Sequence, residues 1–267
     1  MNKQHWLQRT FVWIIFGGVI LSAGNAYNTV CGQGASTRKT KVALIYTVTT
    51  PELKEDTERE VKEQLGRDVE IITYEVPAVF EEIRQTGYVT AAPAAKMLRT
   101  YMEAIEAGAD AILSICSTVG DVAYSAQGVA NYLGVPIVMI NDEMCREAVR
   151  KGNRIAIMAT FPTAIAPTRN TLQRVAREMG KHVEVVDVLV EGAFGIDQEQ
   201  FRARMAAEAG KIAAQVDVIV FAQGSMAYCE QYIAGRFQKT VLSNPRFGAK
   251  ALRASLVEKG LLDALHH

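Results

Sequence analysis

A chain of 267 residues is long enough to bury a substantial core, as one large α/β domain or as two small ones. Its 29 basic and 29 acidic residues leave no net charge, and no run of Lys or Arg exceeds two residues, so the sequence gives no indication of nucleic-acid binding. The four cysteines lie far apart and form no cluster with the four histidines, which argues against a metal site of the zinc type.

Residues 1–40 form a leader that we expect to lie outside the fold. Lys3 and Arg9 precede a run of uncharged, mostly bulky residues at 11–21, and small residues follow up to Ala26. This order is typical of a secretory signal, and the apolar run is shorter than the about 20 residues of a membrane span. The alternative is a non-native extension from an upstream start. The first interpretation predicts an exported protein and the second a cytoplasmic one.

Strand-like and helix-like segments alternate from Lys41 onward. The apolar run 41–48 predicts a strand, and Thr50 followed by Pro51 predicts the N-cap and first turn of an amphipathic helix that reaches Leu65. The same patterns predict the next elements of the first half: a strand at 69–76, a helix at 91–107, a strand at 111–116, a helix around 119–133 and a strand at 136–140.

The series restarts at Arg154, and the restart has the features of an internal repeat. We expect a strand at 154–160, then a helix at 168–179, a strand at 183–190, a helix at 198–214, a strand at 217–223 and a last helix, strand and helix. Three pairs of segments correspond: KVALIYTVTTP with RIAIMATFPT, ADAILSICST with VDVIVFAQGS, and INDEM with SNPRF.

Continuous apolar strands separated by helices indicate parallel sheets that are covered on both faces. We therefore predict an α/β fold of two similar lobes related by a pseudo-two-fold axis, with the active site in the cleft between them. The first lobe is expected at 41–152 and the second at 153–244, and the C-terminal helix at 245–262 is expected to return to the first lobe. Ligands bind beyond the carboxyl ends of parallel strands, which here are the segments 47–50, 116–118, 160–163 and 223–225.

Cys116 ends one of these strands and is followed at once by Ser117 and Thr118. A thiol at the start of a helix has its thiolate form stabilised by unpaired backbone N–H groups, and the hydroxyls and amides beside it suit a bound carboxylate. Such a thiol can carry a proton to or from the carbon that bears the carboxylate. The alternative is a small buried hydrophobic residue, which is how we interpret Cys145 and Cys229.

On these motifs the sequence resembles the aspartate/glutamate/hydantoin racemase superfamily over residues 41–262. Cys116-Ser117-Thr118 is similar to the family's first motif, Cys-Asn-Thr, and residues 222–226 are similar to its second motif with Gln223 in place of the thiol. The resemblance implies two lobes, no cofactor, no metal and a small carboxylate substrate, and it leaves a homo-oligomer open. It also implies that substrate is held by the strand-end residues Thr47, Thr49, Ser117, Thr118, Thr160, Thr163, Gly224 and Ser225, with Cys116 and Gln223 as the catalytic pair.

Gln223 is the departure from the family pattern, because an amide cannot remove a proton from carbon but can donate a hydrogen bond to a carboxylate or enolate oxygen. The sequence therefore predicts a racemase- or isomerase-type enzyme in which two-thiol racemisation is in doubt. A one-base decarboxylase or lyase, similar to the arylmalonate decarboxylase branch, stays open. So do a two-lobe solute-binding protein without chemistry and an inactive relative that serves a partner protein.

Overall fold

The computed structural model describes residues 38–66 and 68–263, so the predicted leader lies outside the described residues up to Thr37. Residues 38–40 are attached to the fold, in contrast to the expectation for the leader. The Thr40 carbonyl accepts a hydrogen bond from the Glu70 backbone N–H, and Arg38 forms an ion pair with Asp110 at 2.6 Å. None of the helices in the described ranges is both long enough and apolar enough to cross a bilayer.

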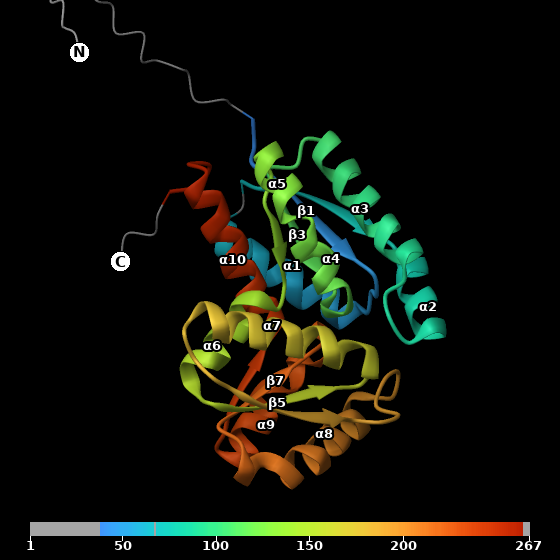
Figure 1. Cartoon of the computed structure of the whole chain (residues 1–267), viewed down its shortest axis with the longest axis vertical. Helices are drawn as coiled ribbons and strands as arrows, with labels where there is room; N and C mark the ends of the chain where they lie inside the picture. The colour runs from blue at the N-terminus through green and yellow to red at the C-terminus, as the bar shows by residue number, and fades with distance from the viewer. Residues whose placement is uncertain (1–37, 67, 264–267) are drawn as a thin grey trace, which may run out of the picture. The chain divides into compact units, whose positions relative to one another are not determined.

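The described residues form two four-stranded parallel sheets, which confirms the predicted α/β fold (Figure 1). The first sheet has the order β2-β1-β3-β4 and the second the order β6-β5-β7-β8, so both follow the same path. The strands are β1 Lys41–Tyr46, β2 Glu70–Glu75, β3 Ala111–Ile115, β4 Ile137–Met139, β5 Arg154–Ala159, β6 Glu184–Leu189, β7 Val218–Phe221 and β8 Thr240–Ser243.

The internal repeat extends to single hydrogen bonds at the start of the strands. The carboxylate of Asp110, just before β3, accepts from the backbone N–H of Lys41 at 2.8 Å. Asp217, just before β7, accepts in the same way from the N–H of Arg154 at 2.9 Å. The two halves of the chain therefore build the same local structure, which places the carboxyl ends of β3 and β7 in corresponding positions.

Helices cover both faces of each sheet. In the first half they are α1 Pro51–Leu65, α2 Pro77–Thr86, α3 Ala91–Glu106, α4 Gly120–Ser125, α5 Gln127–Leu133 and α6 Asp142–Lys151. In the second half they are α7 Ile165–Glu178, α8 Gln198–Ile212, α9 Glu230–Phe237 and α10 Asn244–Glu258. Short 3-10 turns follow three strands, η1 Ser117–Val119, η2 Pro162–Ala164 and η4 Gly224–Cys229, and a further turn, η3 Ala213–Gln215, follows α8.

Local sequence signals account for most of these helices. Thr50 caps α1 as predicted, because its side chain accepts a hydrogen bond from the Leu53 N–H at 3.2 Å. The helix expected around 119–133 is two helices, α4 and α5, which meet at Ala126. The sequence prediction missed α2, which begins at Pro77 and buries Val79, Phe80 and Ile83.

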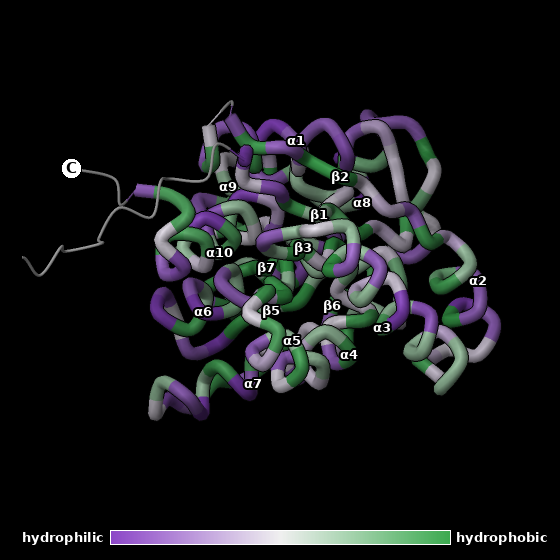
Figure 2. Tube along the Cα trace, turned by 90° about the horizontal axis from the view of Figure 1, so that it is seen from above, coloured by the Kyte–Doolittle hydropathy of each residue, from purple (hydrophilic) through white to green (hydrophobic). Residues whose placement is uncertain are grey.

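The core consists of the two faces of each sheet, and alternate residues along a strand point to opposite faces. Along β1, Ala43 and Ile45 pack beneath α2 and α3, whereas Val42 and Leu44 pack on the other face. Figure 2 shows the same separation, with hydrophobic residues along the central strands and hydrophilic residues along the outer sides of helices such as α1 and α7.

One helix from each half of the chain packs on the sheet of the other half. The buried side chains Ala249, Leu252 and Leu256 of α10 lie against β1 and β3 of the first sheet. Conversely, Met144, Cys145, Ala148 and Val149 of α6 lie against β5 and β7 of the second sheet. The sequence assigns α6 to the first lobe, up to residue 152, whereas its packing joins it to the second. Strand and helix periodicity does not say which sheet an amphipathic helix will cover.

Candidate active site

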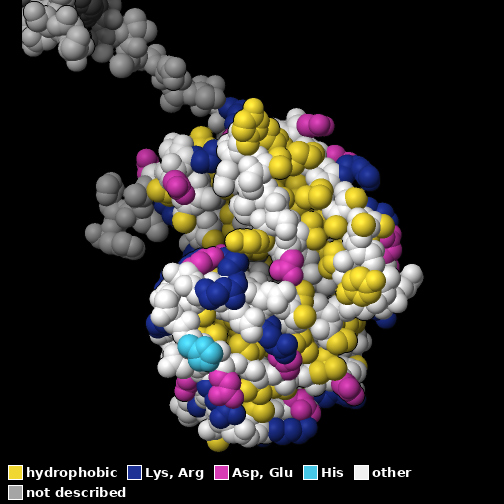
Figure 3. All heavy atoms as spheres, viewed as in Figure 1, with side chains coloured by type: hydrophobic (Ala, Val, Ile, Leu, Met, Phe, Trp, Pro, Cys, Tyr) yellow, Lys and Arg dark blue, Asp and Glu magenta, His cyan; other side chains and the backbone are white. Residues whose placement is uncertain are grey.

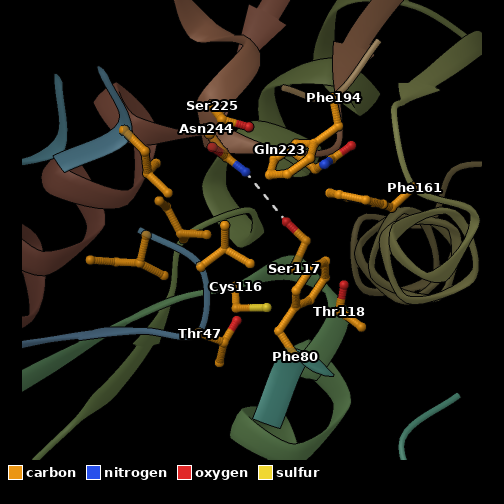
Figure 4. A pocket seen from close by; sticks show the side chains of 15 residues that line it. Thr47, Phe80, Cys116, Ser117, Thr118, Phe161, Phe194, Gln223, Ser225 and Asn244 are labelled. Carbon is orange, nitrogen blue, oxygen red and sulfur yellow. Dashed lines mark hydrogen bonds between the residues drawn. The ribbon is translucent and has the colours of Figure 1, made fainter. Parts of the chain in front are cut away.

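A pocket opens where the carboxyl ends of β1, β3 and β7 meet (Figure 4). The space inside it that a water-sized sphere can occupy is about 50 Å³, and the pocket is open to solvent at its mouth. Seven of the residues predicted from the sequence line it, and they come from both halves of the chain: Thr47, Cys116, Ser117, Thr118, Gln223, Gly224 and Ser225. Distant segments thus meet as the strand-end argument requires.

Cys116 lies between β3 and η1 and is partly exposed to the pocket. The other cysteines in the described part of the chain are buried away from it. Cys145 on α6 and Cys229 in η4 belong to the core clusters on the two faces of the second sheet. Burial raises the pKa of Cys229 to about 11 and raises that of Cys145 further still. Of the described thiols, only Cys116 is therefore available to a ligand in this pocket.

Gln223 faces Thr160 across the ends of β7 and β5 and is held by three hydrogen bonds. Its Oε1 accepts from the Thr160 backbone N–H at 2.6 Å and from the Thr160 Oγ1 hydroxyl at 3.1 Å, and its Nε2 lies 2.8 Å from the same Oγ1. The backbone N–H can only donate, so it fixes Oε1 as the acceptor and leaves the amide NH₂ group as the donor end. Thr160 contacts Gln223 and is not itself among the residues that line the pocket.

Thr47 occupies the position in the first half that Thr160 occupies in the second. Its side chain is 2 % exposed, and its hydroxyl has no hydrogen-bond partner within the described residues. In the second half the corresponding threonine is bonded to Gln223, whereas in the first half the corresponding partner position is Cys116. An unpaired buried hydroxyl at the pocket surface is a polar group that a ligand can satisfy.

Ser117 joins the two halves of the chain at the pocket. Its Oγ hydroxyl donates to the backbone carbonyl of Ala222, at the end of β7, so its own hydrogen is committed. Asn244, the first residue of α10, lies beside this contact, with its Nδ2 3.4 Å from Ser117 Oγ and its Oδ1 buried and unpaired within the described residues. Asn244 is not among the site residues predicted from the sequence, although the correspondence of INDEM with SNPRF pairs it with Asn141.

Besides Thr160, two further predicted substrate-binding residues do not reach this pocket. Thr49 is exposed beyond the end of β1, and the chain turns into α1 directly after it. Thr163 lies in η2 and lines a second pocket, together with Asp121 and Asn170. The η2 turn brings Phe161 to the first pocket instead.

The second pocket lies among α3, α4, α5 and the start of α7. Several of its side chains are apolar and exposed, namely Tyr88 at 66 %, Val129 at 51 % and Leu98 at 41 %. Figure 3 shows hydrophobic side chains gathered over this part of the surface.

Three phenylalanine rings that the sequence analysis did not name form one side of the first pocket: Phe80 on α2, Phe161 after β5 and Phe194 after β6. The Phe80 and Phe161 ring centroids are 5.0 Å apart, and those of Phe161 and Phe194 are 4.6 Å apart. We call these three residues the aromatic wall. No strand-end signal could have found Phe80, because α2 itself was not predicted.

The family model for Asp/Glu/hydantoin racemases matches residues 42–252, which is most of the chain and spans both lobes. The chain belongs to this family. No curated protein sequence matches closely enough to be counted. Within the described part of this racemase-family chain, no group of three or more His, Cys, Asp or Glu side chains could hold a metal ion.

Solved structures of racemases and isomerases have the same fold. An allantoin racemase from Klebsiella pneumoniae has a TM-score of 0.60 at 18% identity, covering 84% of this chain and 90% of its own. A glutamate racemase from Bacillus anthracis has a TM-score of 0.64 at 14% identity, covering 84% of each chain. A maleate cis-trans isomerase from Nocardia farcinica has a TM-score of 0.56 at 14% identity, covering 82% of this chain and 92% of its own. At these identities the likeness shows the fold alone.

Proposed function

We propose that this racemase-family chain is a cofactor-independent, isomerase-type enzyme that moves a proton at the carbon next to the carboxylate of a small acid. Cys116 is the acid/base. The observation that carries the proposal is the position of Cys116 at the floor of a pocket built from both halves, with the other described cysteines buried elsewhere. Neighbours of the same fold are named as racemases and as a cis-trans isomerase, which fits isomerisation without implying their substrates.

The chemistry begins with the Cys116 thiolate. It takes the proton from the reacting carbon, so the C–H bond breaks, an S–H bond forms and the electron pair moves onto the carboxylate as an enediolate. The NH₂ group of Gln223 donates one hydrogen to Thr160 Oγ1 and keeps the second for the developing negative charge. The backbone N–H groups at the start of η4 that precede Met226 are further donors, whereas the Met226 N–H is bonded to the Gln223 carbonyl. The thiol then returns a proton to the planar intermediate: return to the original face regenerates the substrate with solvent exchange only, so net isomerisation requires the intermediate to turn its other face toward Cys116.

Gln223 makes this a one-base site and supports a second candidate function. Its amide cannot remove a proton from carbon, and its carbonyl is already bonded to Thr160. Chemistry on one face is therefore favoured over racemisation by two thiols. Decarboxylation or lyase chemistry has the same requirement, since a carbanion left by loss of carbon dioxide needs one acid to protonate it.

Deuterium incorporation in heavy water tests the role of Cys116. The probes are the separate enantiomers of 2-phenylpropionate, phenylglycine, aspartate and glutamate, together with 2-phenylmalonate for decarboxylation, all followed by NMR. We expect deuterium on one face only, and a loss of about 10²- to 10⁴-fold in Cys116→Ser, the usual contribution of a positioned acid/base. The control, Cys145→Ala, removes a described thiol that does not line the pocket and should leave the rate unchanged.

Two outcomes contradict the proposal. Exchange that persists in Cys116→Ser would remove Cys116 from the mechanism. Exchange or decarboxylation that is absent for every probe would remove proton transfer at such a carbon from the chain's activities.

A further inference from the structure

The aromatic wall gives the pocket an apolar side that runs from its interior to its mouth. Phe80 is 7 % exposed at the inner end, and Phe194 is 42 % exposed at the outer end. Phe161 lies between them and contacts both rings. Figure 4 shows Phe161 and Phe194 close together on the same side of the pocket.

The chain segment that carries Phe161 is anchored next to the ring. Phe161 directly follows Thr160, whose backbone N–H is bonded to Gln223, and it precedes the η2 turn. The hydrogen bonds that orient the Gln223 amide therefore anchor the backbone next to Phe161, and the ring itself is held by its contacts with Phe80 and Phe194. A ring fixed in this way can select ligands by shape, because it does not move aside at little cost.

The pocket offers no charged partner to a ligand. Among the described residues that line it there is no Lys, Arg, His, Asp or Glu. Two arginines that follow strand ends in the second half are engaged elsewhere, Arg169 with Asp187 and Arg246 with Glu230. Burying an unpaired charge is costly, so an ammonium group or a second, side-chain carboxylate would bind poorly here.

One carboxylate is accommodated by neutral donors. Thr118, Ser225 and Gln223 line the pocket with two hydroxyls and an NH₂ group, of which one NH₂ hydrogen is donated to Thr160 Oγ1 and the second is free. Hydrogen bonds from neutral groups to an anion are stronger than those between neutral partners, and they can hold a single negative charge without a cation.

We infer that the substrate carries an apolar group of the size of a phenyl ring on its reacting carbon, with neither an ammonium group nor a side-chain carboxylate, and that Phe161 determines this specificity. The inference rests on the proposed function, since it takes the pocket of Cys116 as the reaction site. It separates this chain's substrate from aspartate and glutamate, whose charged groups would all need partners.

Binding constants test the inference without depending on turnover. They are measured by calorimetry on Cys116→Ser, which holds the ligand without consuming it. The probes are 2-phenylpropionate, 2-methylsuccinate and phenylglycine: the second replaces the phenyl group with a carboxymethyl group, and the third replaces the methyl group with an ammonium group. We expect 2-phenylpropionate to bind at least about tenfold more tightly than either of the others.

Substitutions in the aromatic wall test whether it causes the preference for 2-phenylpropionate. Phe161→Ala should weaken binding of 2-phenylpropionate about tenfold and leave the weak binding of 2-methylsuccinate nearly unchanged. Phe194→Ala, at the exposed end, should act in the same direction and provides the test if Phe161→Ala does not fold. Tyr132→Ala is the matched control, because Tyr132 is an aromatic residue that is 90 % exposed on α5 and does not line the pocket.

The inference is overturned if 2-methylsuccinate or phenylglycine binds as tightly as 2-phenylpropionate, or if 2-phenylpropionate does not bind at millimolar concentration. That failure is distinct from failure of the proposed function, which is decided by whether Cys116→Ser abolishes exchange. If Cys116→Ser abolishes exchange but 2-methylsuccinate or phenylglycine binds more tightly than 2-phenylpropionate, the proposed function stands and the inference about the substrate is wrong.

Discussion

Replacing Gln223 with alanine should measurably destabilise the fold, because the side chain is held by three hydrogen bonds to Thr160. A hydrogen bond contributes about 1 kcal/mol net, and a buried donor left without a partner costs about 1–3 kcal/mol. Thr160 is 7 % exposed, so its backbone N–H would be such a donor, whereas Gln223 is partly open to water. We therefore expect a loss of about 2–3 kcal/mol, which for a domain of this size lowers the melting temperature by about 4–12 °C.

Thermal unfolding followed by circular dichroism measures this loss. Gln223→Glu should lose less, because its carboxylate still accepts from the Thr160 N–H and hydroxyl. Ser225→Ala is the control: Ser225 lines the same pocket and has no side-chain hydrogen bond within the described residues. A Gln223→Ala protein that melts within about 1 °C of the wild type would show that the contact with Thr160 contributes nothing to stability, and the argument for a fixed Phe161 would fall with it.

Three further predictions concern other parts of the chain. The hydrogen bond from the Arg154 backbone N–H lowers the pKa of the Asp217 carboxyl group in the folded protein. The ionised carboxylate therefore stabilises the fold above about pH 4, and this stabilisation is lost as the pH falls through the lower, folded pKa. In urea unfolding from pH 7 to pH 3, the Asp217→Asn protein should be less stable than the wild type at pH 7, and its stability should change less with pH. In Gly224→Ala the new Cβ would lie 2.5 Å from Leu53 Cδ1, so the urea midpoint should fall by the equivalent of about 1–3 kcal/mol, and an unchanged midpoint would mean that the leucine moves freely. With a pKa of about 11, only about one in a thousand Cys229 thiols is ionised at pH 8. Iodoacetamide should therefore modify Cys116 in the pocket far faster than Cys229, which peptide mass mapping would show. Equal rates at the two cysteines would contradict the burial of Cys229.

The strand-end rule predicted most of the residues that line the pocket, whereas their catalytic and binding roles stay predictions. Parallel strands end on the same edge of their sheet, so the apolar runs before Cys116 and Gln223 place each residue at the carboxyl edge of its own sheet, and the packing of the two sheets brings both edges to one pocket. The repeat made the prediction stronger, because the correspondence of the two segments in sequence was enough to pair the two strand ends. The N-cap at Thr50 was equally readable, since it depends on neighbours in sequence only.

Features that depend on tertiary packing could not be predicted from the sequence in this way. Phe80 reaches the pocket from α2, a helix whose short sequence follows a proline and has no cap signal from a side chain. Thr163 was predicted at the site on position alone, but the direction of its side chain is set by the η2 turn. Asn244 belongs to the pocket because α10 starts there, and its contact with Ser117 spans 127 positions of sequence.

The crossed packing of α6 and α10 means that neither half of the chain is a self-sufficient folding unit. A fragment ending at residue 152 would keep α1 but lose α10 from the face of the sheet that holds Val42 and Leu44, and its α6 would have no second sheet to cover. Two copies of such a fragment could repair both defects by lending each other their last helix, as in a domain-swapped dimer. The chain has the arrangement of such a dimer with its two subunits joined end to end. Its single pocket is therefore lined by corresponding strand ends from the two halves, which differ in sequence.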